Sequence, residues 1–138
     1  AAPGTTPTDG AREPAPAPPP GGRTYTATLS GAADPARPGD PDGSGRGSVT
    51  LHAGRNLLCV TLTTSGIGPV TNVHLHRASP SSTRPIVATT APAADGSPDC
   101  LAVGKDVLRR IRSDPAGHYL EVHNPEFPDG ALRGRLSR

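Results

Sequence analysis

The sequence predicts an all-β domain, an antiparallel Greek-key β-sandwich or flattened barrel with at most one short helix. Short segments in which apolar and polar residues alternate recur along the chain, separated by turns rich in glycine and proline. Aromatic residues make up only 2% of the 138 residues, so the core has to be built from valine, leucine, isoleucine and alanine. Short strands joined by such turns are typical of packed antiparallel layers.

The N-terminal segment Ala1–Arg23 differs in composition from the rest of the chain. It contains seven prolines and no large apolar residue. Because it cannot bury enough apolar surface to offset its ordering entropy, we expect a disordered Pro/Ala-rich tail or linker, followed by one folded domain over Thr24–Arg138. The chain has no methionine and no apolar run that resembles a signal segment or a membrane span. These features predict a secreted or extracytoplasmic protein whose signal peptide has been removed.

Alternation defines the strands in the first half of the domain. Tyr25, Ala27 and Leu29 alternate with polar residues, which predicts a half-buried strand. Residues 31–45 are rich in glycine, proline and aspartate and are expected to form a loop. The next expected elements are a strand at 49–51, a tight turn at 53–56, a strand at 58–63 and a turn at 66–69.

The second half of the domain contains a short helix among the strands. Val107, Leu108 and Ile111 are spaced for one or two helical turns, with Asp106 near the start and Pro115–Gly117 at the end. Strands are expected on both sides of this helix, at 73–76, 86–88, 118–123 and 131–136.

One of these strands, Val73-His74-Leu75-His76, alternates apolar and imidazole side chains. Side chains of a strand point alternately to its two faces, so both histidines would share one face. The two apolar residues would occupy the other face and pack into the core.

The strand expected after the helix shows the same alternation. Leu120 and Val122 would face the core, whereas His123 would share the opposite face with Tyr119 and Glu121. If the two histidine-bearing strands lie side by side, three imidazoles meet on the solvent-facing side of the sheet.

The three histidines His74, His76 and His123 are therefore candidate metal ligands. Neutral imidazole suits copper and zinc, and two ligands on one strand need a third from a neighbouring strand. The alternative is that these histidines only form hydrogen bonds with nearby loops, for example with the carboxylates of Asp129 or Glu126.

The C-terminal run carries a family resemblance as well. A His-x-His strand followed by Tyr-x-x-Val-His and Pro-x-Gly-x-x-Arg-Gly-x-Leu resembles CHRD domains, which are named after chordin and also occur alone in bacterial secreted proteins. The resemblance covers Thr24–Arg138, although residues 77–82 replace the glycines that usually follow His-x-His. It implies a non-catalytic extracellular module that binds a protein or cell-surface ligand. The matching residues are Tyr119, Val122, His123, Pro128, Gly130, Arg133, Gly134 and Leu136.

A more distant resemblance is to Cu,Zn superoxide dismutase, another Greek-key sandwich. There a His-x-His strand and a late Val-His provide copper ligands, and an arginine after a glycine-rich turn steers the anion. His74, His76, His123 and Arg133 match these positions in order. If the chain is an enzyme, the resemblance implies a copper-dependent oxidoreductase with Arg133 as a catalytic residue. A bridging histidine and a second-metal cluster are missing from the pattern.

The two cysteines, Cys59 and Cys100, are expected to form a disulfide. Their spacing fits no zinc motif, and disulfides are typical of exported proteins. Two buried free thiols are the alternative. In the chain-entropy model, such a bond stabilises the fold by about 4 kcal/mol.

Charge gives little information about partners. The formal net charge is +2, and the basic cluster of Arg109, Arg110 and Arg112 has no aromatic residues between its members. A nucleic-acid-binding surface usually combines basic with aromatic residues, so we interpret the cluster as a solvated helix face.

Two classes of function follow from the sequence. The first is a secreted, non-catalytic binding module, which the CHRD resemblance implies most directly. The second is a copper or zinc protein that uses the three histidines. We expect ordinary structural or surface roles for the solitary His52 and His118. We interpret Asp40–Gly45 as a polar turn, because it lacks the downstream glutamate of a calcium loop.

Overall fold

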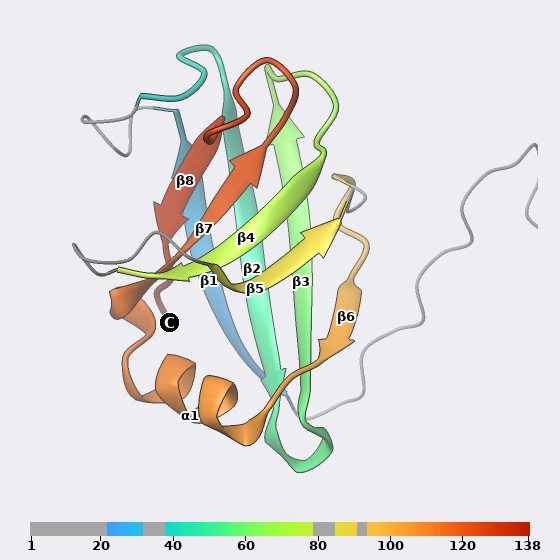
Figure 1. Ribbon diagram of the computed structural model, residues 1–138, viewed down its shortest axis with the longest axis vertical. Coiled ribbons are helices and arrows are strands. Elements are labelled where there is room, and N and C mark those ends of the chain that lie inside the picture. The colour runs from blue at the N-terminus through green and yellow to red at the C-terminus, as the bar shows by residue number, and fades with distance from the viewer. Residues whose placement is uncertain (1–21, 32–37, 79–84, 91–93) are drawn as a thin grey trace, which may run out of the picture.

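The computed structural model describes residues 22–31, 38–78, 85–90 and 94–138 (Figure 1). Within these residues the chain forms one sheet of eight strands, paired antiparallel throughout, and one short α-helix, as predicted. The elements are β1 (Arg23–Ser30), β2 (Ser44–His52), η1 (Ala53–Arg55), β3 (Leu57–Ser65), β4 (Asn72–Arg77), β5 (Pro85–Thr90), β6 (Asp99–Ala102), α1 (Lys105–Ser113), η2 (Pro115–Gly117), β7 (His118–His123) and β8 (Leu132–Arg135).

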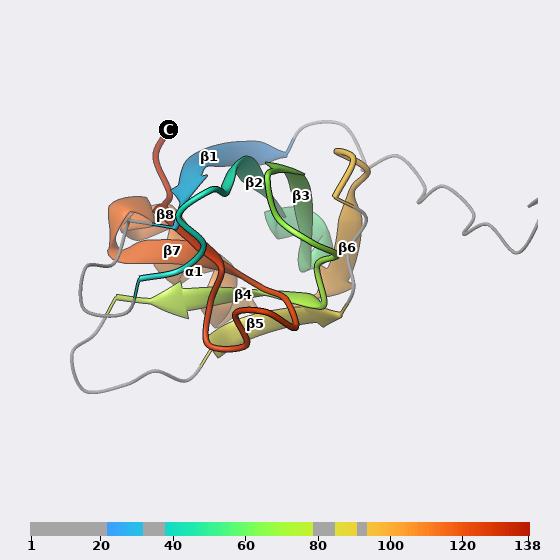
Figure 2. The ribbon, with the colours of Figure 1, turned by 90° about the horizontal axis from the view of Figure 1, so that it is seen from above.

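The sheet has the strand order β5-β4-β7-β8-β1-β2-β3-β6 and curls around the core. Figure 2 shows β1, β2, β3 and β6 on one side of the molecule, facing β4, β5 and β7 on the other. The connection from β3 to β4 crosses between these two sides, so neighbours in sequence are not all neighbours in the sheet. Of the predicted architectures, the flattened barrel describes this half-barrel best.

The sheet turns from one side to the other at the junction of β1 and β8. These strands pair at Ser30 and Arg133, and an isolated bridge joins Thr26 to Ser137 farther along. Between these points, Gly134 lies so close to β1 that an added Cβ atom would be 2.1 Å from the carbonyl oxygen of Thr28. Gly134 is therefore needed for its small size, because the neighbour is backbone and cannot move aside.

The core lies between the two sides and under α1, which closes one end of the half-barrel (Figure 1). The predicted alternation of β4 and β7 is confirmed, since Val73, Leu75, Leu120 and Val122 are all buried in this core. The other buried apolar residues of the cluster are Tyr25, Ala27, Leu29, Val49, Leu51, Leu58, Val60, Leu62, Val87, Leu108, Ile111, Ala131, Leu132 and Leu136.

Two strands differ from the prediction. β2 begins at Ser44, inside the expected loop, because its pairing with β1 extends as far as Ser30. β6 was not predicted, since its four residues include an aspartate and a cysteine and show no alternation in burial. Pairing with β3 at the edge of the sheet, rather than burial of one face, defines this strand.

The strand pair β3–β6 contains the disulfide. Cys59 and Cys100 stand directly opposite each other in the register, with their Cα atoms 4.0 Å apart, and their sulfur atoms are bonded. The expectation from the sequence is confirmed, and no free cysteine is left in the described chain.

The N-terminal tail lies mostly outside the described residues. Arg23, the last residue of the expected tail, already belongs to β1. The described part of the chain contains no helix with the length and apolar character of a membrane span.

Candidate metal centre

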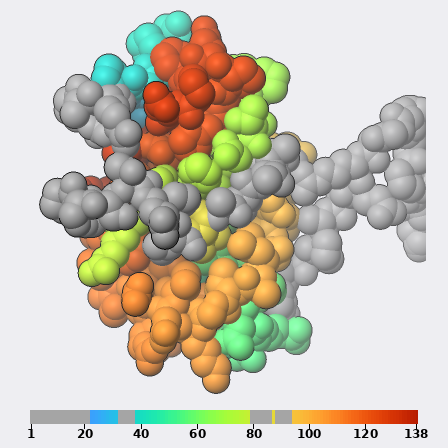
Figure 3. Space-filling view, in the orientation of Figure 1, coloured from blue at the N-terminus to red at the C-terminus, as the bar shows by residue number. Residues whose placement is uncertain are grey.

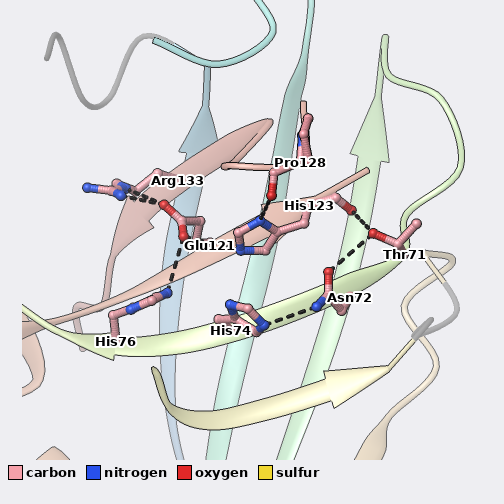
Figure 4. A network of polar contacts seen from close by, with 8 residues as sticks. All are labelled: Thr71, Asn72, His74, His76, Glu121, His123, Pro128 and Arg133. Atoms are coloured by element: carbon pink, nitrogen blue, oxygen red, sulfur yellow. Dashed lines mark hydrogen bonds and ion pairs between the residues drawn. The ribbon is translucent and has the colours of Figure 1, made fainter. Parts of the chain in front are cut away.

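Four potential metal ligands gather on the face of β4 and β7 that points away from the core. β4 provides His74 and His76, and β7 provides Glu121 and His123. The strands are antiparallel neighbours in which His74 pairs with Glu121. One ligand atom from each of the four side chains lies within 4.8 Å of those of the others. Figure 4 shows the four side chains turned toward a common centre.

The cluster is buried, which corrects the expectation of a solvent-facing patch. His76, Glu121 and His123 are only 4%, 4% and 7% exposed, and His74 is partly buried. The segment between β7 and β8 packs against this face. Nδ1 of His123 donates a hydrogen bond to the Pro128 carbonyl oxygen, and Gly130 lies against the Glu121 side chain. Figure 3 shows the C-terminal part of the chain, in red, lying beside β4, in yellow-green. Alternation predicts the face of a strand but not the loop that covers it.

Glu121 completes the cluster and was not among the ligands predicted from the sequence. Its Oε1 atom lies 3.2 Å from Nε2 of His76 and 3.2 Å from Nε2 of His123. The sequence signal was its parity, because it alternates onto the same face as His123. The carboxylate that contacts these histidines is thus Glu121 rather than the loop residues Asp129 and Glu126.

Arg133 lies at the same site, where its guanidinium group is bound to Glu121. Its Nε donates a hydrogen bond of 3.1 Å to Oε2 of Glu121, and its Nη2 donates to the same oxygen. The guanidinium carbon also lies 4.3 Å from the centre of the Tyr119 ring, which stacks on His76. Arg133 therefore holds Oε2 and leaves Oε1 to the histidines.

The electrostatics of the cluster favour a cation. Burial alone would raise the pKa of Glu121, but its contacts with His123, His76 and Arg133 hold that pKa far below its ordinary value. Burial, together with repulsion from His123 and His76, lowers the pKa of His74. Glu121 thus stays negative, and the lowered pKa of His74 favours the neutral form of that imidazole.

The hydrogen-bond partner of His123 determines which of its two ring nitrogens carries the hydrogen in the neutral form. Nδ1 of His123 lies 2.9 Å from the carbonyl oxygen of Pro128. A carbonyl only accepts, so Nδ1 carries the hydrogen and the neutral ring presents the Nε2 lone pair to Oε1 of Glu121. Burial alone would lower the pKa of His123, but Glu121 and the Pro128 carbonyl raise it, consistent with a proton or another cation between these atoms.

The spacing of these atoms suits a metal ion. Nε2 of His76 and of His123 are buried and form no well-aligned hydrogen bond in the described structure. Ligand atoms of a tetrahedral zinc site, with bonds of roughly 2.0–2.1 Å, lie about 3.3 Å from one another. The two separations of 3.2 Å between nitrogen and Oε1 are close to this value. The residues present therefore fit a nitrogen- and oxygen-coordinated transition metal.

The other residues singled out in the sequence lie elsewhere. His52 and His118 are buried away from the cluster, and Nδ1 of His118 donates to the Asp114 carbonyl oxygen at 2.8 Å. Asp40 is buried and accepts a hydrogen bond from the Asp42 amide, as expected of a polar turn. The arginines of α1 are exposed, and Arg109 pairs with Asp106 on the same helix.

Comparison with known proteins identifies the family. The family model for the CHRD domain matches residues 25–136, so the chain belongs to the CHRD domain family. No curated protein and no solved structure matches the chain.

Proposed function

We propose that this CHRD domain is an extracytoplasmic module that binds one transition-metal ion, zinc or copper(II), through His74, His76, Glu121 and His123. The observation that carries the proposal is the buried Oε1 atom of Glu121, which stands 3.2 Å from two imidazole nitrogens that lack aligned hydrogen bonds. Buried polar atoms are costly unless they have partners, and one shared cation would provide the partner for all of them.

Family membership and the disulfide support the location of the module outside the cytoplasm. A protein or cell-surface ligand is the partner that the CHRD resemblance implies, and metal binding is compatible with it. The described surface has no exposed large hydrophobic residue that would mark a docking site. The metal centre is therefore the function that the geometry supports best.

The proposal gives Arg133 a structural role. Because its guanidinium is bound to Glu121, Arg133 orients the carboxylate so that Oε1 faces the histidines. Binding of a metal, rather than dismutase-type redox chemistry, is what this arrangement supports.

Metal binding can be tested on protein purified without a histidine tag. After loading with zinc or copper(II) and removal of excess ion, elemental analysis should find one ion per chain, and isothermal titration should give the same stoichiometry. His76→Ala and His123→Ala should each weaken binding by more than the roughly 10–100-fold typical of losing an outer-shell partner.

The matched control is His52→Gln, which removes a buried histidine outside the cluster. It should leave affinity and stoichiometry unchanged. A wild-type protein that retains no ion, or variants of His76 and His123 that bind as tightly as wild type, would overturn the proposal.

A further inference from the structure

His74 differs from the other two histidines in the nitrogen that faces the cluster. Its Nε2 atom lies 3.0 Å from Nδ2 of the Asn72 side-chain amide, two residues earlier on β4. Figure 4 shows that its other ring nitrogen, Nδ1, points toward His123 and Glu121. His76 and His123 instead present Nε2 to Glu121. Whether His74 can bind a metal therefore depends on which of its two nitrogens carries the hydrogen.

The Asn72 amide determines this. If its nitrogen faces His74, Nε2 accepts a hydrogen bond and the ring hydrogen sits on Nδ1, where it points into the cluster and blocks metal binding. If its oxygen faces His74, Nε2–H donates to that oxygen and the Nδ1 lone pair is free. The two orientations differ by half a turn of the amide group and are distinguished by the surrounding hydrogen bonds.

Thr71 distinguishes the two orientations. Its hydroxyl oxygen lies 3.2 Å from Oδ1 of Asn72 and 3.1 Å from the backbone carbonyl oxygen of His123. Both are acceptors, but a hydroxyl group has one hydrogen, so it can satisfy only one of them.

With the amide turned, each of these groups has a partner. Nδ2 of Asn72 donates to the Thr71 hydroxyl, which donates to the His123 carbonyl, and Nε2–H of His74 donates to Oδ1 of Asn72. In either orientation the His123 carbonyl also accepts from the Thr71 backbone amide, at 2.9 Å. The turned amide still allows one more hydrogen bond, because the Thr71 hydroxyl then accepts from Nδ2 of Asn72 while it donates to the His123 carbonyl.

We propose that Asn72, held by Thr71, is a positioning residue that fixes the Nε2–H tautomer of His74 and makes Nδ1 its metal-binding atom. The inference rests on the proposed function of the cluster and deepens it. The metal would then be bound by Nδ1 of His74, by Nε2 of His76 and His123, and by Oε1 of Glu121. An outer partner that fixes the tautomer of a metal-binding histidine is a common feature of such sites.

The tautomer can be measured directly, without metal, by long-range proton–nitrogen correlation spectra of the ¹⁵N-labelled full chain at about pH 8, above the ordinary pKa of histidine. In wild type, Nε2 of His74 should have the shift of a protonated ring nitrogen and Nδ1 that of an unprotonated one. Asn72→Asp keeps an acceptor and should preserve this pattern. Asn72→Ala should give a mixture of tautomers and weaken zinc binding by roughly 10–100-fold.

The outcomes separate the inference from the proposal on which it rests. A wild-type spectrum with the hydrogen on Nδ1 of His74 would overturn the inference even if zinc binds. A tautomer that Asn72→Ala leaves unchanged would overturn the role of Asn72. Failure of a wild-type protein with the Nε2–H tautomer to bind zinc would instead overturn the metal centre, and the assignment of Nδ1 as a donor with it. The wild-type spectrum is decisive even if Asn72→Ala does not fold.

Discussion

At the scale of single residues, Glu121 links the fold to the candidate site. Its two carboxylate oxygens have different partners: Oε2 accepts from Arg133, and Oε1 faces His76 and His123. A buried carboxylate is retained only if such partners balance the loss of hydration. The same contacts that stabilise the charge therefore prepare the site for a cation.

This buried charge predicts how the metal-free protein responds to acid. The pKa of Glu121 is held below its ordinary value of 4.5. As the pH falls below 4.5, Glu121 therefore stays ionised in the folded protein but takes up a proton in the unfolded chain. The stability that this residue contributes is present above pH 4.5 and is lost as the pH falls toward the folded pKa, at about 1.4 kcal/mol per pH unit. Glu121→Gln should reduce the slope of unfolding free energy against pH below 4.5, measured by urea denaturation.

Glu126→Gln serves as the control, because it removes an exposed carboxylate from the neighbouring loop. This variant should retain the wild-type slope. Equal slopes for wild type and Glu121→Gln would show that Glu121 is not the buried charge described above.

Much of the site could be predicted from alternation in two short segments. His74, His76 and His123 were placed correctly on one face because Leu75 and Val122 have to face the core. Their burial could not be predicted, since it depends on how the β7–β8 segment folds back over them. The pairing of Glu121 with Arg133 depends on the same fold, because the two residues become neighbours only when β7 pairs with β8.

At the scale of elements, the disulfide fixes an edge strand that has little else to hold it. β6 is four residues long and pairs only with β3 among the described strands. The same features explain why the sequence does not predict it: β6 lacks the apolar alternation of β1 or β3. Covalent attachment of Cys100 to Cys59 compensates for the small area that β6 buries.

Reduction of this disulfide should therefore lower the free energy of unfolding. The bond closes a loop with a sequence separation of 41, which corresponds to about 4 kcal/mol in the chain-entropy model. The measurement is urea denaturation with and without reductant, with loss of the bond verified by mass spectrometry. The double variant Cys59→Ser/Cys100→Ser should be unaffected by reductant. An unchanged midpoint for fully reduced wild type would contradict the prediction.

At the scale of the whole molecule, the half-barrel depends on the close approach of β8 and β1. Gly134 allows this approach, and the added Cβ of any other residue would collide with the Thr28 backbone. Gly134→Ala should lower the free energy of unfolding by about 1–3 kcal/mol or more, the range for inserting a methyl group into a packed site.

Gly54→Ala is the matched control, because a Cβ at Gly54 would meet no atom within 4 Å. In thermal and urea denaturation, Gly134→Ala should be clearly less stable than Gly54→Ala. A Gly134→Ala protein as stable as Gly54→Ala would show that the corner of the sheet can relax.

The disulfide and the candidate metal centre have a joint consequence for chain topology. Cys59 is bonded to Cys100, and a bound ion would connect His76, which lies between these cysteines in sequence, to Glu121, which lies beyond them. The two closures would therefore overlap along the chain rather than nest or follow each other. The first opens on reduction and the second on chelation, so the segment from Cys59 to Glu121 would carry two interlocked constraints that respond to different chemical signals.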